Sequence, residues 1–156
     1  MAKKLIIVES PAKAKTIHKI LGGDFEVTSS MGHLVDLPSS KLGVDVDHDF
    51  APHYIVIYKR RKFAKQLLQE ARGSNAIYLA PDPDREGEAI SWHLAQLLEK
   101  DRIAQDQRQK ASKAASSPAA ARARKKPGAP RDGLTIYRIA FHEITPHAVR
   151  AALAHP

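Results

Sequence analysis

Residues 76–87 read AIYLAPDPDREG, and this stretch decides the fold. Its first five residues are apolar, as expected for a strand that is buried on both faces of a parallel sheet. An acidic turn follows, and residues 88–98 then predict an amphipathic helix whose inward positions are Ile90, Leu94, Leu97 and Leu98. The order strand, turn, helix predicts one unit of an α/β sheet.

The same alternation extends through the rest of the chain. Residues 5–8 (LIIV) predict another buried strand, and Ser10 with Pro11 predicts the cap and first turn of a helix that continues over residues 12–20. Further strands are predicted at residues 25–29, 54–58 and 134–141, and further helices at residues 62–71 and 146–153, with a long loop at 31–52. We therefore predict an α/β fold with a mostly parallel sheet flanked by helices.

The chain is basic, and most of the excess charge lies in one segment. Its 156 residues include 25 Lys and Arg against 17 Asp and Glu, a formal charge of +8. Residues 100–132 hold 10 of the basic and 3 of the acidic residues, a net +7, and Ile103 is their only large apolar residue. We predict a single domain over residues 1–156 in which residues 100–132 form a disordered basic insertion. Such a charge balance indicates a polyanion partner, meaning DNA, RNA or an acidic membrane surface, to which the insertion could add salt-sensitive contacts.

Composition also excludes several classes of protein. The chain has no Cys, which excludes a disulfide framework, a Cys-containing zinc finger and a thiol nucleophile. Only four consecutive apolar residues, 5–8, follow the first lysines, which fits neither a signal peptide nor a membrane span. We expect a cytoplasmic protein.

Carboxylates follow two of the predicted strands. Glu9 comes directly after residues 5–8, and Asp82, Asp84 and Glu86 come directly after residues 76–80. If these strands are neighbours, four carboxylates meet at one edge of the sheet and repel one another unless a cation lies among them. Oxygen ligands favour Mg²⁺. The alternative is that the acids only cap a helix and shape a turn, which would be the better interpretation of a lone D-x-D.

Two basic residues near the same edge are candidates for binding phosphate. Lys13 lies one helical turn after Glu9, near the predicted start of a helix, where backbone N–H groups also favour anions. His33 follows Gly32 in the loop beyond the strand at 25–29, and it could contact a phosphate or a base. The alternatives are a solvated surface lysine and an ordinary loop histidine.

Other motifs offer little chemistry. Neither G-x-x-x-x-G-K-[ST] nor G-x-G-x-x-G occurs, which argues against ordinary nucleotide hydrolysis. The four tyrosines lie in or beside predicted strands, where an aromatic residue is ordinary packing, so no chemistry is assigned to any of them. Trp92 alone makes no stacking platform for single-stranded nucleic acid.

Four segments together carry a family resemblance. Residues 8–16 (VESPAKAKT), 31–38 (MGHLVDLP) and 82–90 (DPDREGEAI) resemble the N-terminal part of the bacterial type IA DNA topoisomerases, and 82–90 resembles the acidic signature of their Toprim domain. Residues 141–145 (FHEIT) are similar to the segment that closes this domain. The resemblance covers residues 1–99 and 134–156, and the insertion at 100–132 departs from it.

The resemblance implies a Rossmann-like Toprim fold and roles for individual residues. It implies that Asp82, Asp84 and Glu86 bind Mg²⁺ with Glu9 nearby, and that Glu9 helps to transfer a proton at the scissile 3′ oxygen of DNA. It further implies that Lys13 supports the phosphate. DNA is expected to lie near Lys13, His33 and Arg85.

The family's activity is relaxation of negatively supercoiled DNA by transient cleavage and religation of one strand through a tyrosine in a later domain. No tyrosine here lies in a matching motif, so we expect an N-terminal fragment that is inactive alone and monomeric. Its expected partners are a single-stranded segment of DNA and the remaining domains of the same enzyme, at the nucleoid and not at a membrane. Two alternatives stay open: a Toprim primase or nuclease type of phosphotransfer domain, and a non-enzymatic basic module that binds nucleic acid.

Overall fold

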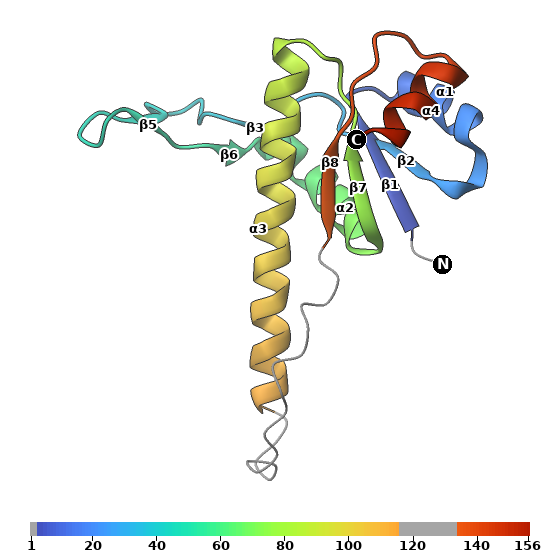
Figure 1. The fold of residues 1–156 in the computed structure, drawn as a ribbon. Helices are drawn as coiled ribbons and strands as arrows, with labels where there is room; N and C mark the ends of the chain where they lie inside the picture. Colours follow the sequence, from blue (N-terminus) through green and yellow to red (C-terminus); the bar gives the residue numbers. More distant parts are fainter. Residues whose placement is uncertain (1–2, 116–133) are drawn as a thin grey trace.

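A four-stranded parallel sheet forms the centre of the molecule (Figure 1). The computed structural model describes residues 3–115 and 134–156. The strand order is β2-β1-β7-β8, and every neighbouring pair is parallel. The strands span β1 Lys3–Val8, β2 Glu26–Ser29, β7 Ser74–Leu79 and β8 Thr135–Arg138. The predicted α/β fold is confirmed, although β8 is shorter than the run predicted at residues 134–141.

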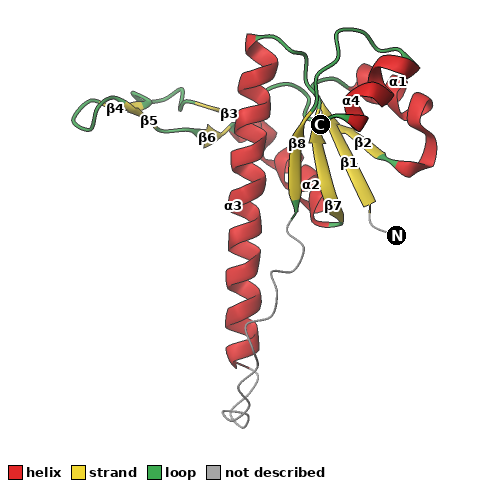
Figure 2. Cartoon of the chain, in the orientation of Figure 1, coloured by secondary structure: helices red, strands yellow, loops and turns green. Residues whose placement is uncertain are grey.

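Helices cover both faces of the sheet (Figure 2). The helices α1 Pro11–Leu21 and α4 Pro146–Ala154 lie on one face, and α2 Arg61–Arg72 and α3 Arg85–Ala115 lie on the other. A hydrophobic core lies on each face of the sheet, and alternate residues of β1 contribute to each. Leu5 and Ile7 pack toward α2 and α3, while Ile6 and Val8 pack toward α1 and α4. All four side chains are at most 1% exposed, so this strand is buried on both faces as predicted.

Two helices begin where the sequence predicts. Ser10 accepts a hydrogen bond from the Lys13 backbone N–H at 3.4 Å, and Pro11 is the first residue of α1. In the same way Thr145 accepts from the Ala148 N–H at 3.2 Å at the start of α4. These caps satisfy N–H groups that have no partner within the helix.

A ribbon-like arm occupies the long connection between β2 and α2 and extends away from the sheet (Figures 1 and 2). Two short antiparallel pairs build it: β3 Val35–Asp36 with β6 Ile55–Val56, and β4 Val44–Asp45 with β5 Ala51–Pro52. The strand predicted at residues 54–58 is therefore only two residues long, and the predicted loop contains the rest of the arm. Two 3₁₀ turns complete the fold, η1 Gly22–Asp24 after α1 and η2 Tyr58–Arg60 before α2.

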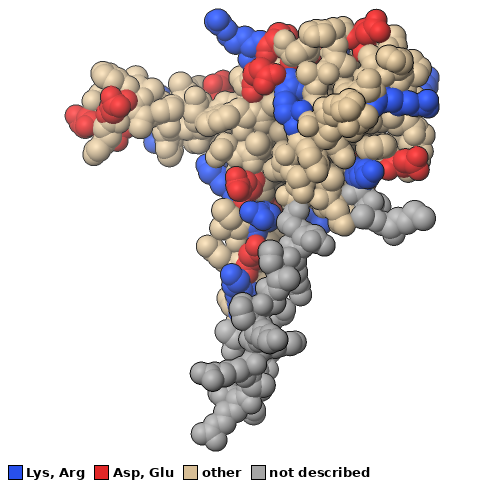
Figure 3. Space-filling model, in the orientation of Figure 1, with Lys and Arg blue, Asp and Glu red and all other residues tan. Residues whose placement is uncertain are grey.

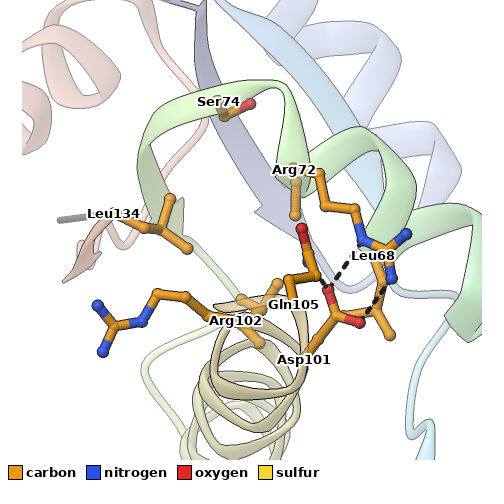
Figure 4. A pocket seen from close by; sticks show the side chains of 9 residues that line it. Leu68, Arg72, Ser74, Asp101, Arg102, Gln105 and Leu134 are labelled. Atoms are coloured by element: carbon orange, nitrogen blue, oxygen red, sulfur yellow. Dashed lines mark hydrogen bonds and ion pairs between the residues drawn. The ribbon is translucent and has the colours of Figure 1, made fainter. Parts of the chain in front are cut away.

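The prediction of a disordered insertion at residues 100–132 is wrong for its first part, because α3 continues to Ala115. The segment is rich in good helix formers, which extend a helix already anchored in the core. Asp101 also accepts two hydrogen bonds from the Arg72 guanidinium, at 3.0 and 2.7 Å, which ties α3 to the end of α2 (Figure 4). The rest of the predicted insertion, 116–132, lies outside the described residues.

No helix within residues 3–115 and 134–156 is both long and apolar enough to cross a membrane.

Candidate functional site

The carboxyl edge of the sheet brings Glu9 and Asp82 to one lysine. The two acids follow β1 and β7, which are neighbours and pair Ile7 with Leu79 at their ends. The Lys13 Nζ lies 2.5 Å from Asp82 Oδ2 and is also ion-paired with Glu9 Oε1. A cation therefore does lie among the carboxylates, and it is supplied by the first turn of α1.

The acidic surroundings keep Lys13 charged. Burial lowers the pKa of its ammonium group, but hydrogen bonds to Asp82 and Glu9, with their charges, outweigh burial and hold the pKa above its ordinary value of 10.5. The side chain is only 25% exposed, so its charge is directed at this edge and not at bulk water. Lys13 is a fixed positive charge at the centre of the site.

A tight turn after β2 delivers His33 to the same edge. The Gly32 N–H donates to the Glu9 carbonyl at 2.9 Å, which pins the turn onto the end of β1. Met31 and Gly32 both have positive φ, 56° and 82°, a conformation that glycine adopts without strain. The turn places His33 Nε2 3.5 Å from Glu86 Oε1.

The loop after β7 is held by a helix cap and a close backbone approach. Asp84 Oδ1 accepts from the Gly87 N–H at 2.6 Å, so the capping interpretation is correct for this one acid. A Cβ on Gly87 would lie 1.8 Å from the Asp82 carbonyl oxygen, so only glycine allows the loop to fold back on the helix in this way. The cap and the glycine together present Asp82 and Glu86 at the edge.

Arg138, at the end of β8, braces this loop and was not predicted. Its guanidinium donates to the carbonyls of Leu79 and Asp82, each at 3.2 Å, to the Ile139 carbonyl, and to Glu88 Oε1 at 2.6 Å. The sequence feature that could have indicated this role is a single cation, Arg138, within a predicted strand whose other residues are mostly apolar or aromatic. Its strand register, opposite Leu79, places it beside the acidic loop.

Arg85, predicted to lie near DNA, is the first residue of α3 and is exposed. No hydrogen bond or ion pair joins it to another residue of the described part of the chain. The structure therefore leaves its guanidinium available at the edge, next to Glu86.

The residues at this edge fit a hard cation, although they are not arranged as a finished cage. Among the described residues, no three His, Asp or Glu side chains come together as a ready group of ligands. Glu9 Oε2 and Ser30 Oγ are nevertheless buried with no hydrogen-bond partner in residues 3–115 and 134–156, and buried oxygens without a partner are rare. Asp82 and Glu86 are half or more exposed, so an all-oxygen set suited to Mg²⁺ can be reached from solvent.

Comparisons with known proteins agree with this architecture. The family model for the Toprim domain matches residues 4–114. A curated relative, DNA topoisomerase 1 of Treponema pallidum (strain Nichols), is 43% identical over 154 residues, which are 99% of this chain and 17% of that protein. A solved structure of full-length topoisomerase I from Thermotoga maritima is 39% identical with a TM-score of 0.70, over 97% of this chain and 20% of that one. The chain thus spans about a fifth of the length of these relatives.

Proposed function

This chain belongs to the Toprim domain family, and from that premise we propose that it is the magnesium-binding, proton-transferring part of a type IA DNA topoisomerase. The proposed substrate is a single-stranded segment of negatively supercoiled DNA, which is cut and resealed. The nucleophile would be a tyrosine outside this chain, consistent with relatives about five to six times as long. The proposed setting is the bacterial cytoplasm, with DNA and the remaining domains of the same enzyme as partners.

One observation carries the proposal: Lys13 joins Glu9 and Asp82 at the carboxyl edge of the sheet. Helix capping explains Asp84 but requires neither Glu9 nor a lysine between two strand ends. An arrangement of one carboxylate with a buried, unpaired oxygen, one fixed cation and an exposed acidic loop suits chemistry on a phosphodiester.

Glu9 would serve as the general acid for cleavage. When the tyrosine oxygen attacks phosphorus, its hydroxyl proton passes to solvent, the bond to the 3′ oxygen breaks, and that oxygen needs a proton. Glu9 Oε1 is engaged by Lys13, so a proton taken up from solvent would be carried on Oε2, which is buried and without a partner among the described residues, and would pass from there to the 3′ oxygen. Religation reverses both steps, with Glu9 accepting the proton as the 3′ oxygen attacks the phosphotyrosine.

Lys13 would stabilise the phosphate on which negative charge develops, because its pKa keeps it protonated at any physiological pH. His33, which lies 3.5 Å from Glu86, and Arg85, the exposed residue before Glu86, would contact the DNA strand. When Mg²⁺ is held by Asp82, Asp84 and Glu86, it would neutralise and position backbone phosphates.

A chimera tests this function directly. The matched region of the T. pallidum relative is replaced by this chain, and relaxation of negatively supercoiled plasmid is measured with Mg²⁺ present. We expect the chimera to relax the plasmid, and Glu9→Gln in the chimera to lower the rate by about 10²–10⁴-fold, the usual contribution of a general acid. Glu99→Gln, an exposed acid on α3, is the matched control and should leave the rate unchanged.

Two results would count against the proposal. Full-rate relaxation by the Glu9→Gln chimera would remove the assigned proton donor. Relaxation by the purified 156-residue chain alone would show that no external tyrosine is needed.

A further inference from the structure

An aromatic pocket lies between α3 and the base of the arm, beside the acidic edge. It is a cavity of about 160 Å³, and its walls include Tyr54, Val56, Trp92, His93, Gln96 and Lys100. The residues come from β6, from the residue just before it and from two turns of α3, so the pocket exists only once the arm has packed against the helix.

Three aromatic rings meet in this pocket. Tyr54 lies 5.8 Å from Trp92 and 4.5 Å from His93 between ring centroids, and Trp92 lies 5.0 Å from His93. All three contacts are edge-to-face, with interplanar angles of 68–71°, so none of these rings is stacked face to face on another of the three. Trp92 is 53% exposed and Tyr54 is 40% exposed, which is unusual for such large apolar surfaces.

The pocket also contains an unsatisfied polar atom. His93 Nδ1 is buried and has no hydrogen-bond partner in the part of the chain that the structure describes. Burial lowers the pKa of His93, and His33 lowers it further while Asp36 opposes them, so the ring is neutral near pH 7. A neutral imidazole can donate from one nitrogen and accept at the other, which suits the edge of a heterocycle. Val35, two residues after His33, also lines the pocket, so the pocket adjoins the segment that carries His33.

One cation lines the pocket, and four more follow β6 closely in the chain. Lys100 lies at the pocket wall, and the four consecutive cations are residues 59–62, which begin three residues after β6. None of these four forms an ion pair with a described residue, and Arg61 lies 5.2 Å above the exposed Tyr58 ring. Cations at the start of a helix oppose its dipole, so stability of α2 does not explain them. The far end of the arm is acidic instead (Figure 3), with exposed Asp45, Asp47 and Asp49.

We propose that this aromatic pocket binds one unpaired nucleobase of single-stranded DNA, stacked against Trp92 and Tyr54, while Lys100 and the cations at 59–62 hold the adjoining phosphates. Stacking on aromatic rings within a basic groove is the general mode of single-strand binding. The inference rests on the proposed function, because the same strand would continue from the pocket to the acidic edge. The ring contacts with Tyr54 and His93 show that Trp92 does not stand alone, contrary to the expectation from the sequence.

Trp92 is the only tryptophan of the chain, so its fluorescence reports on this pocket alone. The probes are a short oligothymidylate and an abasic oligonucleotide of equal length and charge. We expect oligothymidylate to quench Trp92 emission in a saturable and salt-dependent way, and the abasic strand to leave the emission nearly unchanged. Lys100→Gln should weaken binding of both strands equally.

Anisotropy of the labelled oligothymidylate measures affinity in the variants. Trp92→Ala should weaken binding by about tenfold, since stacking of one base contributes that order of affinity. The matched control is Ile103→Ala, which removes a comparably exposed apolar side chain from the same helix, at 48% exposure, and should have no effect.

Three results would contradict the proposal that this pocket binds a nucleobase. Equal quenching by the abasic strand would mean that only phosphates bind there, and tight binding with neither quenching nor an effect of Trp92→Ala would place the strand elsewhere. A change of Trp92 emission with protein concentration and none with either oligonucleotide would assign the surface to protein contact. None of these results would affect Mg²⁺ binding at Asp82 and Asp84, so the proposed function would fail or stand separately.

Discussion

Opposite edges of the sheet both carry acid–base pairs, but the pairs differ in what they leave unsatisfied. At the amino edge, Arg72 and Asp101 satisfy each other through two parallel hydrogen bonds beside a cavity of about 100 Å³ (Figure 4). At the carboxyl edge, Lys13 is shared between two acids, and the buried Glu9 Oε2 has no hydrogen-bond partner among the described residues.

This difference distinguishes an ion pair that only stabilises the fold from one that can also bind a ligand. A bidentate pair uses its donors and acceptors on itself, so it stabilises the fold and has little left for a ligand. A cation shared by two acids, beside a carboxylate oxygen without a hydrogen-bond partner, can still bind a ligand. Leaving that buried oxygen unpaired lowers the stability of the fold. Charge alone therefore does not distinguish the proposed site from a structural ion pair, whereas a buried oxygen without a hydrogen-bond partner, at the point where two strands end, does.

The largest effect is expected when the backbone of the carboxyl edge is disturbed. Gly87→Ala would place a Cβ against the Asp82 carbonyl, and we expect a loss of about 1–3 kcal/mol in the free energy of unfolding, with weaker Mg²⁺ binding. Chemical denaturation and calorimetry measure the two effects. Gly23→Ala, where nothing lies within 4 Å, should change stability by less than about 0.5 kcal/mol, and an equal loss there would contradict the argument.

A smaller effect is expected when the loop loses its brace but keeps its backbone. Arg138→Met removes the donors to the Leu79 and Asp82 carbonyls while retaining the apolar stem, and we expect Mg²⁺ affinity to fall by about tenfold, as for other groups that orient ligands. Calorimetric titration measures the affinity. Arg102→Met, which breaks only an exposed pair with Glu99, serves as the control. Unchanged Mg²⁺ affinity in Arg138→Met would show that the loop needs no such support.

The smallest effect is expected at the amino edge. Arg72→Met should lower the free energy of unfolding by about 0.5–1 kcal/mol and leave Mg²⁺ binding unchanged, because the pair with Asp101 only stabilises the fold. The hydrogen bond from Arg72 holds the pKa of Asp101 below its ordinary value of 3.8. The pair's contribution is therefore present above pH 3.8 and disappears as the pH falls through the lower folded-state pKa.

Denaturation of the wild-type chain and Arg72→Met across this pH range checks the sign. The difference in unfolding free energy should shrink as the pH falls below 3.8. A difference that grows on acidification, or a fall in Mg²⁺ affinity, would remove the distinction between the two edges.

The residues of the carboxyl edge could be predicted from the sequence because they directly follow predicted strands. An apolar run such as residues 5–8 predicts a buried strand, and a parallel strand fixes where the next residue, Glu9, must lie. The cap residues Ser10 and Thr145 were equally predictable, because capping depends on contacts within three residues.

Features built from distant segments could not be predicted in this way. The aromatic pocket needs Tyr54 and Trp92 to meet, and Arg138 reaches Asp82 from another strand. The helical residues after Lys100 are not predictable from composition, because their polar residues are typical of disorder, whereas an anchored helix can extend through good helix formers without a core.

The most direct test of the account is calorimetric titration of the chain with Mg²⁺, comparing wild type with Asp82→Asn combined with Asp84→Asn. Asparagine preserves the helix cap, so the fold should survive. The control is Asp47→Asn with Asp49→Asn, an exposed pair of the same spacing on the arm. The account predicts that binding is lost in the first double variant and retained in the control. Wild-type Mg²⁺ affinity in the first double variant would contradict it.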